Sequence, residues 1–342
     1  MAVEVKLGKG KTTDPDFKAY TVNGYLINEP LTSNNSGFSK WGYCTKYGKT
    51  FFIKEFLSPK FPEPDAEISE TRRRNQINEC NEWFKERSKV YDIIMRSTGG
   101  NIVVPRDFFL FENHFYLVTD KVDTNSVKFE ELHRASAEQK HVLLKVLANE
   151  FSKLAAGGIV HSDIKPNNLI LKSTLNDFFT VKIIDFDDSF REEKVPYWDE
   201  LHGDLAYFSP EAVLYMDTEG EEGVITTKSD VFSLGLLFHE LLCGKFPEIK
   251  DVDNYTYIGE EILNGNKPLI NNQISGVYRN IIEQMLCDDP NERISMKEVF
   301  VKLCSIDKTE PGVTDEKTDE KAEKESAGRT SRWQKASDMM FD

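Results

Sequence analysis

One thirteen-residue segment constrains this chain more than any other part of it. IVHSDIKPNNLIL, residues 159–171, places a polar loop between two apolar runs. Seventeen residues after Asn168, another apolar run, VKII, ends at Asp185. Short β-branched runs that stop at polar residues are typical of buried strands. The pattern therefore predicts that short strands hold these polar side chains in fixed places.

The polar residues of this segment match the needs of phosphoryl transfer. That reaction uses a carboxylate to position and deprotonate the attacking hydroxyl, a cation near the moving phosphate, and hard oxygen ligands for magnesium. Asp163, Lys165, Asn168 and Asp185 supply this set. One amide and one carboxylate can suffice for Mg²⁺, because the ion keeps several of its water ligands.

The periodicity of the chain changes from strand-like to helical. Residues 17–56 contain short aromatic and β-branched runs between Asn, Ser and Gly turns, which predict an antiparallel meander. Residues 68–95 show helical spacing of apolar positions, and two more strands follow around RDFFLF and HFYLVTDKV. From residue 137 onward helices dominate, and we expect the polar residues 1–16 to be flexible.

Charge and cysteine content exclude several classes of protein. The net charge of −15 over 342 residues disfavours binding to nucleic acid, because phosphate is also anionic. The five cysteines are far apart and form no CxxC pair, so neither a disulfide framework nor a zinc site is predicted. No apolar run is long enough to span a membrane or to serve as a signal peptide. We therefore expect a soluble cytoplasmic protein with no membrane partner.

The chain resembles the eukaryotic-type serine/threonine protein kinases over roughly residues 20–304. Besides residues 159–171, the chain contains four other motifs in the order that the family shows. They are FFIKEF with Lys54, SPE at 209–211, KSDVFSLG at 228–235, and DDPNER with Arg293. This resemblance implies an α+β, bilobal protein-kinase-like fold. A small antiparallel sheet with one main helix would form the N-lobe, 17–122, and a mainly helical C-lobe would span 123–304.

The resemblance also implies a nucleotide site that uses ATP and Mg²⁺. Asp163 and Lys165 would be catalytic, whereas Asn168 and Asp185 would hold the metal. Lys54 would hold the α- and β-phosphates and pair with a glutamate of the following helix. We choose Glu79 for this partner because it adjoins the core-facing stripe, with Glu82 as the second choice.

The remaining nucleotide contacts also follow from the resemblance. The gate of the adenine pocket would be Thr119, backbone groups of Asp120 and Val122 would contact the purine, and Ile170 would form the floor. Gly37 would belong to the phosphate-covering loop. Three further residues would have supporting roles: His161 would pack under the Asp185–Phe186 turn, Asp230 would hold the catalytic loop, and Glu211 would pair with Arg293.

Several positions depart from the family pattern. Gly37 is the one glycine in TSNNSG, where the family has a glycine-rich loop, and Phe52 replaces a small alanine beside the adenine site. Asp187 replaces the glycine after Asp185–Phe186, and this change should disfavour flipping of the turn. Asp204 stands where serine/threonine kinases have a threonine, close to Lys165. An ion pair there would either replace the threonine bridge or inhibit.

The last part of the chain differs in composition. Residues 305–342 are mostly acidic and polar, which predicts a disordered tail. Apolar residues return in SRWQKASDMMFD, and we hypothesise that residues 330–342 form a short docking motif for a partner.

Three functions remain open on the sequence. The first is an ATP- and magnesium-dependent kinase that phosphorylates protein hydroxyls, with a weak preference for basic flanks because of the acidic run at 217–222. The second is a pseudokinase that acts as a nucleotide-binding scaffold, a reading motivated by the missing glycines, Phe52 and Asp204. The third is a small-molecule phosphotransferase, because DFDD is similar to the acidic motif of aminoglycoside-type enzymes. The motifs of the large lobe favour protein substrates.

Overall fold

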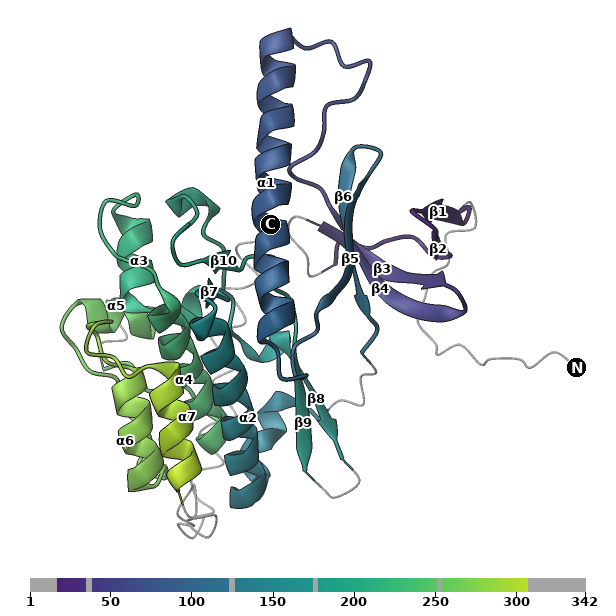
Figure 1. The fold of residues 1–342 in the computed structure, drawn as a ribbon. Coiled ribbons are helices and arrows are strands. Elements are labelled where there is room, and N and C mark those ends of the chain that lie inside the picture. Colours follow the sequence, from purple (N-terminus) through teal and green to yellow (C-terminus); the bar gives the residue numbers. More distant parts are fainter. Residues whose placement is uncertain (1–16, 35–38, 123–126, 175–177, 251–253, 307–342) are drawn as a thin grey trace, which may run out of the picture.

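The computed structural model describes residues 17–34, 39–122, 127–174, 178–250 and 254–306 (Figure 1). The N-terminal segment 1–16, Gly37 and the proposed docking motif at 330–342 lie outside these residues. Within them, an antiparallel sheet stands on one side of the molecule and a group of helices on the other. This arrangement confirms the expected bilobal α+β fold.

The sheet has the order β1-β2-β3-β4-β6-β5 within the described residues. Its strands are β1 (Tyr20–Val22), β2 (Tyr25–Ile27), β3 (Ser39–Lys46), β4 (Lys49–Phe56), β5 (Pro105–Phe111) and β6 (His114–Asp120). On β4, Lys54 lies opposite Trp41 of β3, and Phe52 lies opposite Thr119 of β6. Because Lys54 and Phe52 are two residues apart, their side chains project from the same face of the sheet.

Helix α1 (Glu70–Ser97) crosses between the sheet and the helical lobe (Figure 1). It begins where Ser69 Oγ accepts a hydrogen bond from the backbone N–H of Arg72, a normal N-cap. Its buried residues Cys80, Tyr91 and Ile94 belong to the predicted apolar stripe, and Val90 joins them. The helix begins and ends two residues later than the predicted range of 68–95.

The helical lobe is built around α4, which is buried along most of its length. Its other long helix, α2, begins with a capping box between Ser136 and Gln139 and ends at Ala156, where Gly157 is the C-cap. The helices of this lobe are α2 (Ala137–Ala156), α3 (Pro210–Asp217), α4 (Thr227–Cys243), α5 (Ile258–Leu263), α6 (Gly276–Met285) and α7 (Met296–Ser305).

Four short strands flank the segments that carry the polar motifs at residues 159–171 and at Asp185. β8 (Leu169–Ser173) pairs with β9 (Phe179–Ile183), and β7 (Ile159–Val160) pairs with β10 (Phe190–Arg191). One apolar cluster runs from Phe56 on β4 through α1 to α2, α4 and α7. The lobes therefore share a continuous core. No helix among the described ranges has the length and apolar character needed to cross a bilayer.

Candidate active site

The loop after β7 is held by the first turn of α4. Asp230 Oδ2 accepts a hydrogen bond from the backbone N–H of His161 at 2.7 Å, and its Oδ1 accepts one from the N–H of Ser162 at 3.2 Å. Burial raises the pKa of Asp230 to about 7, although both donors favour its carboxylate form. Ser162 has a φ of +71°, a strained value for a serine that these bonds help to hold. Asp230 thus supports the loop, as expected.

His161 is a packed side chain and faces no open site. It is 1% exposed, and its ring lies 4.6 Å from that of Phe186, centroid to centroid. Its Nδ1 accepts a hydrogen bond from the backbone N–H of Asp163 at 3.3 Å, and burial lowers the pKa of its imidazole. The expected support of the Asp185–Phe186 turn by His161 is therefore present.

Asp163 is the centre of a dense polar network. Its carboxylate accepts from Asn168 Nδ2 at 2.7 Å and from the backbone N–H of Asp204 at 3.1 Å, and Lys165 Nζ lies 2.9 Å from Oδ2. The side chain of Asp163 is 7% exposed, whereas that of Lys165 is 26% exposed. The two predicted catalytic groups are thus in contact, with the lysine on the more open side.

Asp204 takes part through its backbone. Its N–H donates to Asp163, while its carboxylate accepts from the N–H of Ala206 and caps the short turn Leu205–Tyr207. The ion partner that the structure gives Lys165 is Asp163. The departure at Asp204 therefore preserves a link to Asp163, the predicted catalytic aspartate.

Lys54 reaches across from the sheet to the segment after β9. Its Nζ lies 2.8 Å from Asp185 Oδ1 and 2.5 Å from Asp187 Oδ2. Burial works to lower the pKa of Lys54, but the carboxylates of Asp187 and Asp185 outweigh it and raise that pKa above its usual value. Asp185 has a φ of +63°, a strained conformation of the kind that gathers at functional sites.

Asn168 and Asp185 fit the needs of a divalent cation. The Asn168 amide nitrogen donates to both Asp163 O and Asp163 Oδ2, which leaves the amide oxygen as the group for a metal. The side chain of Asp185 is 39% exposed, so an ion can reach it from solvent. One amide oxygen and one carboxylate are hard ligands of the type that Mg²⁺ prefers.

The predicted adenine contacts lie along β4, β6 and β8. Thr119 is buried on β6, Asp120 ends that strand in an exposed two-bond pair with Arg106, and Val122 is half-buried just beyond it. Ile170 is half-buried on β8. The ring of Phe52 stacks on Trp41 with centroids 5.8 Å apart, and so one aromatic face covers this side of the sheet.

The structure does not bring Glu79 to Lys54. Glu79 and the second choice, Glu82, are exposed on α1. The α1 residue that reaches the segment after β9 is Arg87, which donates from Nη1 to the backbone carbonyls of Phe186 at 3.1 Å and Ser189 at 2.8 Å. The physical reason is the rotation of α1, which buries the stripe of Cys80 and Tyr91 and turns Glu79 outward.

Two site residues were missed by sequence reasoning, Asp187 as a partner of Lys54 and Arg87 as the contact from α1. The sequence did carry a signal for each. Asp187 is an acidic residue at a position where the family has glycine, and Arg87 stands four residues before the buried Tyr91, on the same face of the helix. Neither signal identifies its partner, which lies about a hundred residues away.

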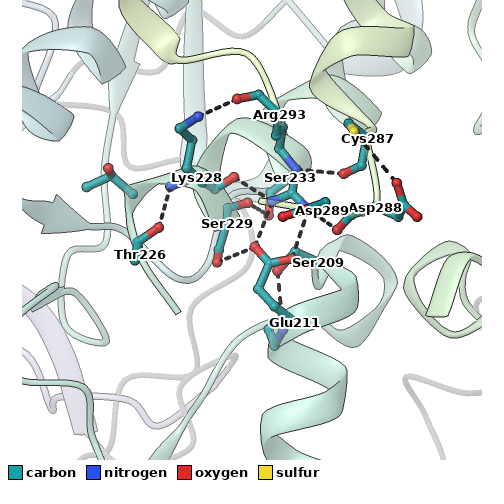
Figure 2. Close-up of polar contacts among 12 residues, drawn as sticks. Ser209, Glu211, Thr226, Lys228, Ser229, Ser233, Cys287, Asp288, Asp289 and Arg293 are labelled. Atoms are coloured by element: carbon teal, nitrogen blue, oxygen red, sulfur yellow. Dashed lines mark hydrogen bonds and ion pairs between the residues drawn. The ribbon is translucent and has the colours of Figure 1, made fainter. Parts of the chain in front are cut away.

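A second ionic cluster braces the large lobe (Figure 2). Arg293 and Glu211 form a buried pair with two bonds, Nη1–Oε1 at 2.6 Å and Nη2–Oε2 at 2.8 Å. Ser229 Oγ donates to the same glutamate, and Arg293 Nε donates to the Cys287 carbonyl at 2.9 Å. The cluster therefore joins the start of α3, the start of α4 and the loop before α7, as the motif order led us to expect.

Comparison with known proteins identifies a family for the region that holds the Asp163 network and the Arg293 cluster. Residues 69–302 match the family model described as protein kinase domain. The chain is 25% identical to calcium-dependent protein kinase 27 of Arabidopsis thaliana over 288 residues, which are 81% of this chain and 53% of that protein. It is 28% identical to the probable serine/threonine-protein kinase fhkC of Dictyostelium discoideum over 282 residues, 81% of this chain and 43% of that protein.

A shorter match has higher identity. The calcium and calcium/calmodulin-dependent serine/threonine-protein kinase of Pisum sativum is 35% identical over 145 residues, 42% of this chain and 26% of that protein. The chain thus spans about half or less of the length of these three relatives. Because the family model covers more than half of the 342 residues, the chain belongs to the protein kinase domain family.

Proposed function

We propose that this protein is an ATP- and magnesium-dependent serine/threonine kinase that transfers the γ-phosphate of ATP to a protein hydroxyl. The observation that carries the proposal is the network around Asp163. One buried carboxylate there contacts Lys165, Asn168 and the backbone of Asp204 at 2.7 to 3.1 Å. Such a network holds a catalytic base in one orientation before substrate arrives.

Each residue has a distinct task in this proposal. Asp163 positions the substrate hydroxyl and accepts its proton as the oxygen attacks the γ-phosphorus, and the bond to the bridging oxygen of ADP breaks. Lys165, beside Asp163 and more exposed, offsets the negative charge of the phosphoryl group in transfer. Lys54 orients the phosphates of ATP from the sheet side.

The adenine and metal contacts are also proposals. Asn168 and Asp185 would hold Mg²⁺, which when bound offsets phosphate charge and orients the triphosphate. The purine would lie between Phe52 and Ile170, with Thr119 behind it and the backbone of Asp120 and Val122 at its edge. Gly37 would belong to the loop above the phosphates.

The test is transfer from labelled ATP by the full chain with its Asp163→Asn variant beside it. The substitution keeps the size of the side chain and removes the base, so we expect phosphate transfer to fall at least a hundredfold, on the order found for such groups. Asp92→Asn, at an exposed position of α1, is the matched control and should keep full activity. Phosphoamino-acid analysis then identifies the acceptor hydroxyl.

The pseudokinase reading has one observation in its favour. Phe52 adds an aromatic ring at a position that the family keeps small, and this ring stacks on Trp41 with centroids 5.8 Å apart. The same experiment separates the two functions. If ATP and Mg²⁺ raise the melting temperature while the wild-type chain transfers no phosphate, the protein is a nucleotide-binding scaffold.

A further inference from the structure

We infer that Asp187 is the residue that positions Lys54 for the nucleotide phosphates, in place of a carboxylate from α1. The inference rests on the proposed function, because it assigns a role within the same site. It concerns Asp187, which follows the Asp185–Phe186 turn, and the α1 cation Arg87, which anchors that turn. Asp187 is a positioning residue, since it acts through Lys54 and does not touch the substrate.

The two carboxylates beside Lys54 are not equivalent. Asp187 Oδ2 is the nearer, at 2.5 Å from Nζ, and its side chain is 16% exposed. The side chain of Asp185 is 39% exposed and is the predicted metal ligand. A carboxylate facing solvent is accessible to a cation, whereas the shielded one is left to hold the lysine. Asp187 is therefore suited to remain with Lys54 while Asp185 serves the metal.

Helix α1 offers no carboxylate for this task among the described residues. Glu70, Glu79, Glu82 and Asp92 are exposed. Glu86 is occupied, with Oε1 at 2.6 Å from Lys89 and Oε2 at 2.8 Å from Arg191. The charged α1 side chain that contacts the turn after Asp185 is that of Arg87, which is positive.

Arg87 brackets Asp187 along the chain. It hydrogen-bonds the carbonyls of Phe186, one residue before Asp187, and Ser189, two residues after it. Three polar atoms of this region are buried without a hydrogen-bond partner, namely Asp187 Oδ1, Arg87 Nε and Tyr91 Oη. One is an acceptor and two can donate, but the structure shows no hydrogen bond among the three.

The backbone also accommodates a side chain at this position. The residue with the left-handed conformation is Asp185, at a φ of +63°, whereas Asp187 does not have a positive φ. No glycine is required at Asp187, and its carboxylate is held without backbone strain. In this arrangement the turn supplies Asp187 as the negative partner of Lys54. Helix α1 supplies the positive Arg87, which binds the turn.

The test compares Asp187→Asn with the wild-type chain in two measurements. The first is kcat/KM for ATP, which we expect to fall at least tenfold because Lys54 loses its shielded anion. The second is equilibrium binding of ATP with Mg²⁺ and of adenosine, measured by calorimetry. We expect ATP binding to weaken at least fivefold and adenosine binding to stay within twofold, since adenosine has no phosphate for Lys54.

A matched control and a rescue exclude a purely structural role. Asp188→Asn changes the next carboxylate, which faces His202 at 3.6 Å, and should leave both measurements within twofold of wild type. The double variant Arg87→Glu with Asp187→Gly moves the anion from the turn to α1. We expect it to regain at least a third of the wild-type ATP affinity, while the single Asp187→Gly variant does not.

The outcomes separate this inference from the proposed function. If wild type transfers phosphate and Asp187→Asn keeps its kcat/KM within twofold, the inference is overturned and the kinase stands. If the wild-type chain transfers no phosphate, the binding measurements with ATP and adenosine still test the role of Asp187. Loss of the preference for ATP over adenosine in Asp187→Asn supports the inference, and an unchanged preference, or no binding of ATP by wild type, overturns it.

Discussion

At the residue scale, identical side chains have different tasks because their neighbours differ. Asp163 faces Lys165 and an amide, Asp230 faces two backbone N–H groups, and Asp187 faces Lys54. In the proposed function, only the first would meet the substrate hydroxyl. The second fixes a loop, and the third orients a cation. Residue type alone therefore names the chemistry that is available, and the partners decide its use.

His239 is a buried residue whose partners predict a pH effect on stability. Its Nδ1 bonds the Lys245 carbonyl at 2.7 Å, and its Nε2 accepts from the backbone N–H of Asn271 at 3.0 Å. This pattern requires a neutral ring, and burial lowers the pKa of His239 to about 4. In the unfolded chain the pKa of histidine is about 6.5. The neutral His239 ring therefore contributes its full stabilisation of the native state above about pH 6.5. This contribution to the free energy of unfolding is lost as the pH falls from about 6.5 toward 4.

We therefore expect the free energy of unfolding to drop by about 2 kcal/mol from this group between about pH 7.5 and pH 5. Urea denaturation at both pH values measures it. His239→Gln, which keeps an amide donor and acceptor but does not titrate, should show a pH dependence smaller by that amount. His202→Gln, at a side chain 41% exposed, is the control. Equal pH dependence in wild type and His239→Gln would contradict the assignment.

At the scale of elements, α1 is the part whose neighbours matter most for the site. Its inner stripe packs on β5, β6 and α2, and its polar flank contacts the segment after β9. Glu86 on α1 is 2.8 Å from Arg191 of β10 and 3.8 Å from Lys194. Hydrogen bonding to Lys89 and Arg191 lowers the pKa of Glu86 to about 2, so the glutamate is charged throughout the working range of pH. The Glu86–Arg191 ion pair joins α1 directly to β10, so this contact needs no phosphorylated residue.

Removing this link should loosen β10 more than it unfolds the protein. The side chains of Glu86 and Arg191 are about a fifth exposed, so Glu86→Gln should cost no more than about 1 kcal/mol of stability. We expect phosphate transfer to fall severalfold and amide hydrogen exchange at residues 190–194 to speed up. Glu82→Gln, exposed one turn earlier, is the control. Unchanged exchange in Glu86→Gln would show that the ion pair does not hold the strand.

At the scale of the whole molecule, the negative net charge affects which substrates the protein attracts. The chain carries a net charge of −15, and the exposed residues Glu219, Glu221 and Glu222 follow α3 on the helical lobe. A protein of this charge attracts basic peptides over distances set by ionic strength. We propose that substrates have basic residues near the acceptor hydroxyl.

This preference is measurable with matched peptides. We expect kcat/KM to be several times higher for basic than for acidic flanks at low salt, and the ratio to shrink as salt rises. Changing Glu219, Glu221 and Glu222 to Gln should reduce the ratio, whereas Asp92→Asn on the distant α1 should not. Equal rates on both peptides would remove the proposed preference, and a ratio independent of salt would assign it to direct contacts.

The sequence by itself determined the order of the elements and the residues proposed to carry the chemistry. Strand and helix periods and the spacing from Asp163 to Asp185 are local properties, and local properties are written in consecutive residues. The bilobal fold and the pair of Glu211 with Arg293 followed from motif order. The fold and this ion pair were confirmed because each depends on short-range pattern or on the known order of a family, whereas the roles of the site residues stay predictions.

Only the tertiary structure decided which charges meet Lys54 and the turn after β9. Lys54 is 133 residues from Asp187, and Arg87 is 99 residues from the Phe186 carbonyl that it contacts. Such pairs depend on how α1 is rotated about its axis, and one residue of helix turns a side chain by about 100°. That rotation is set by many packing contacts together. Hence the choice of Glu79, reasonable on local spacing, placed the carboxylate on a face that packing turns to solvent.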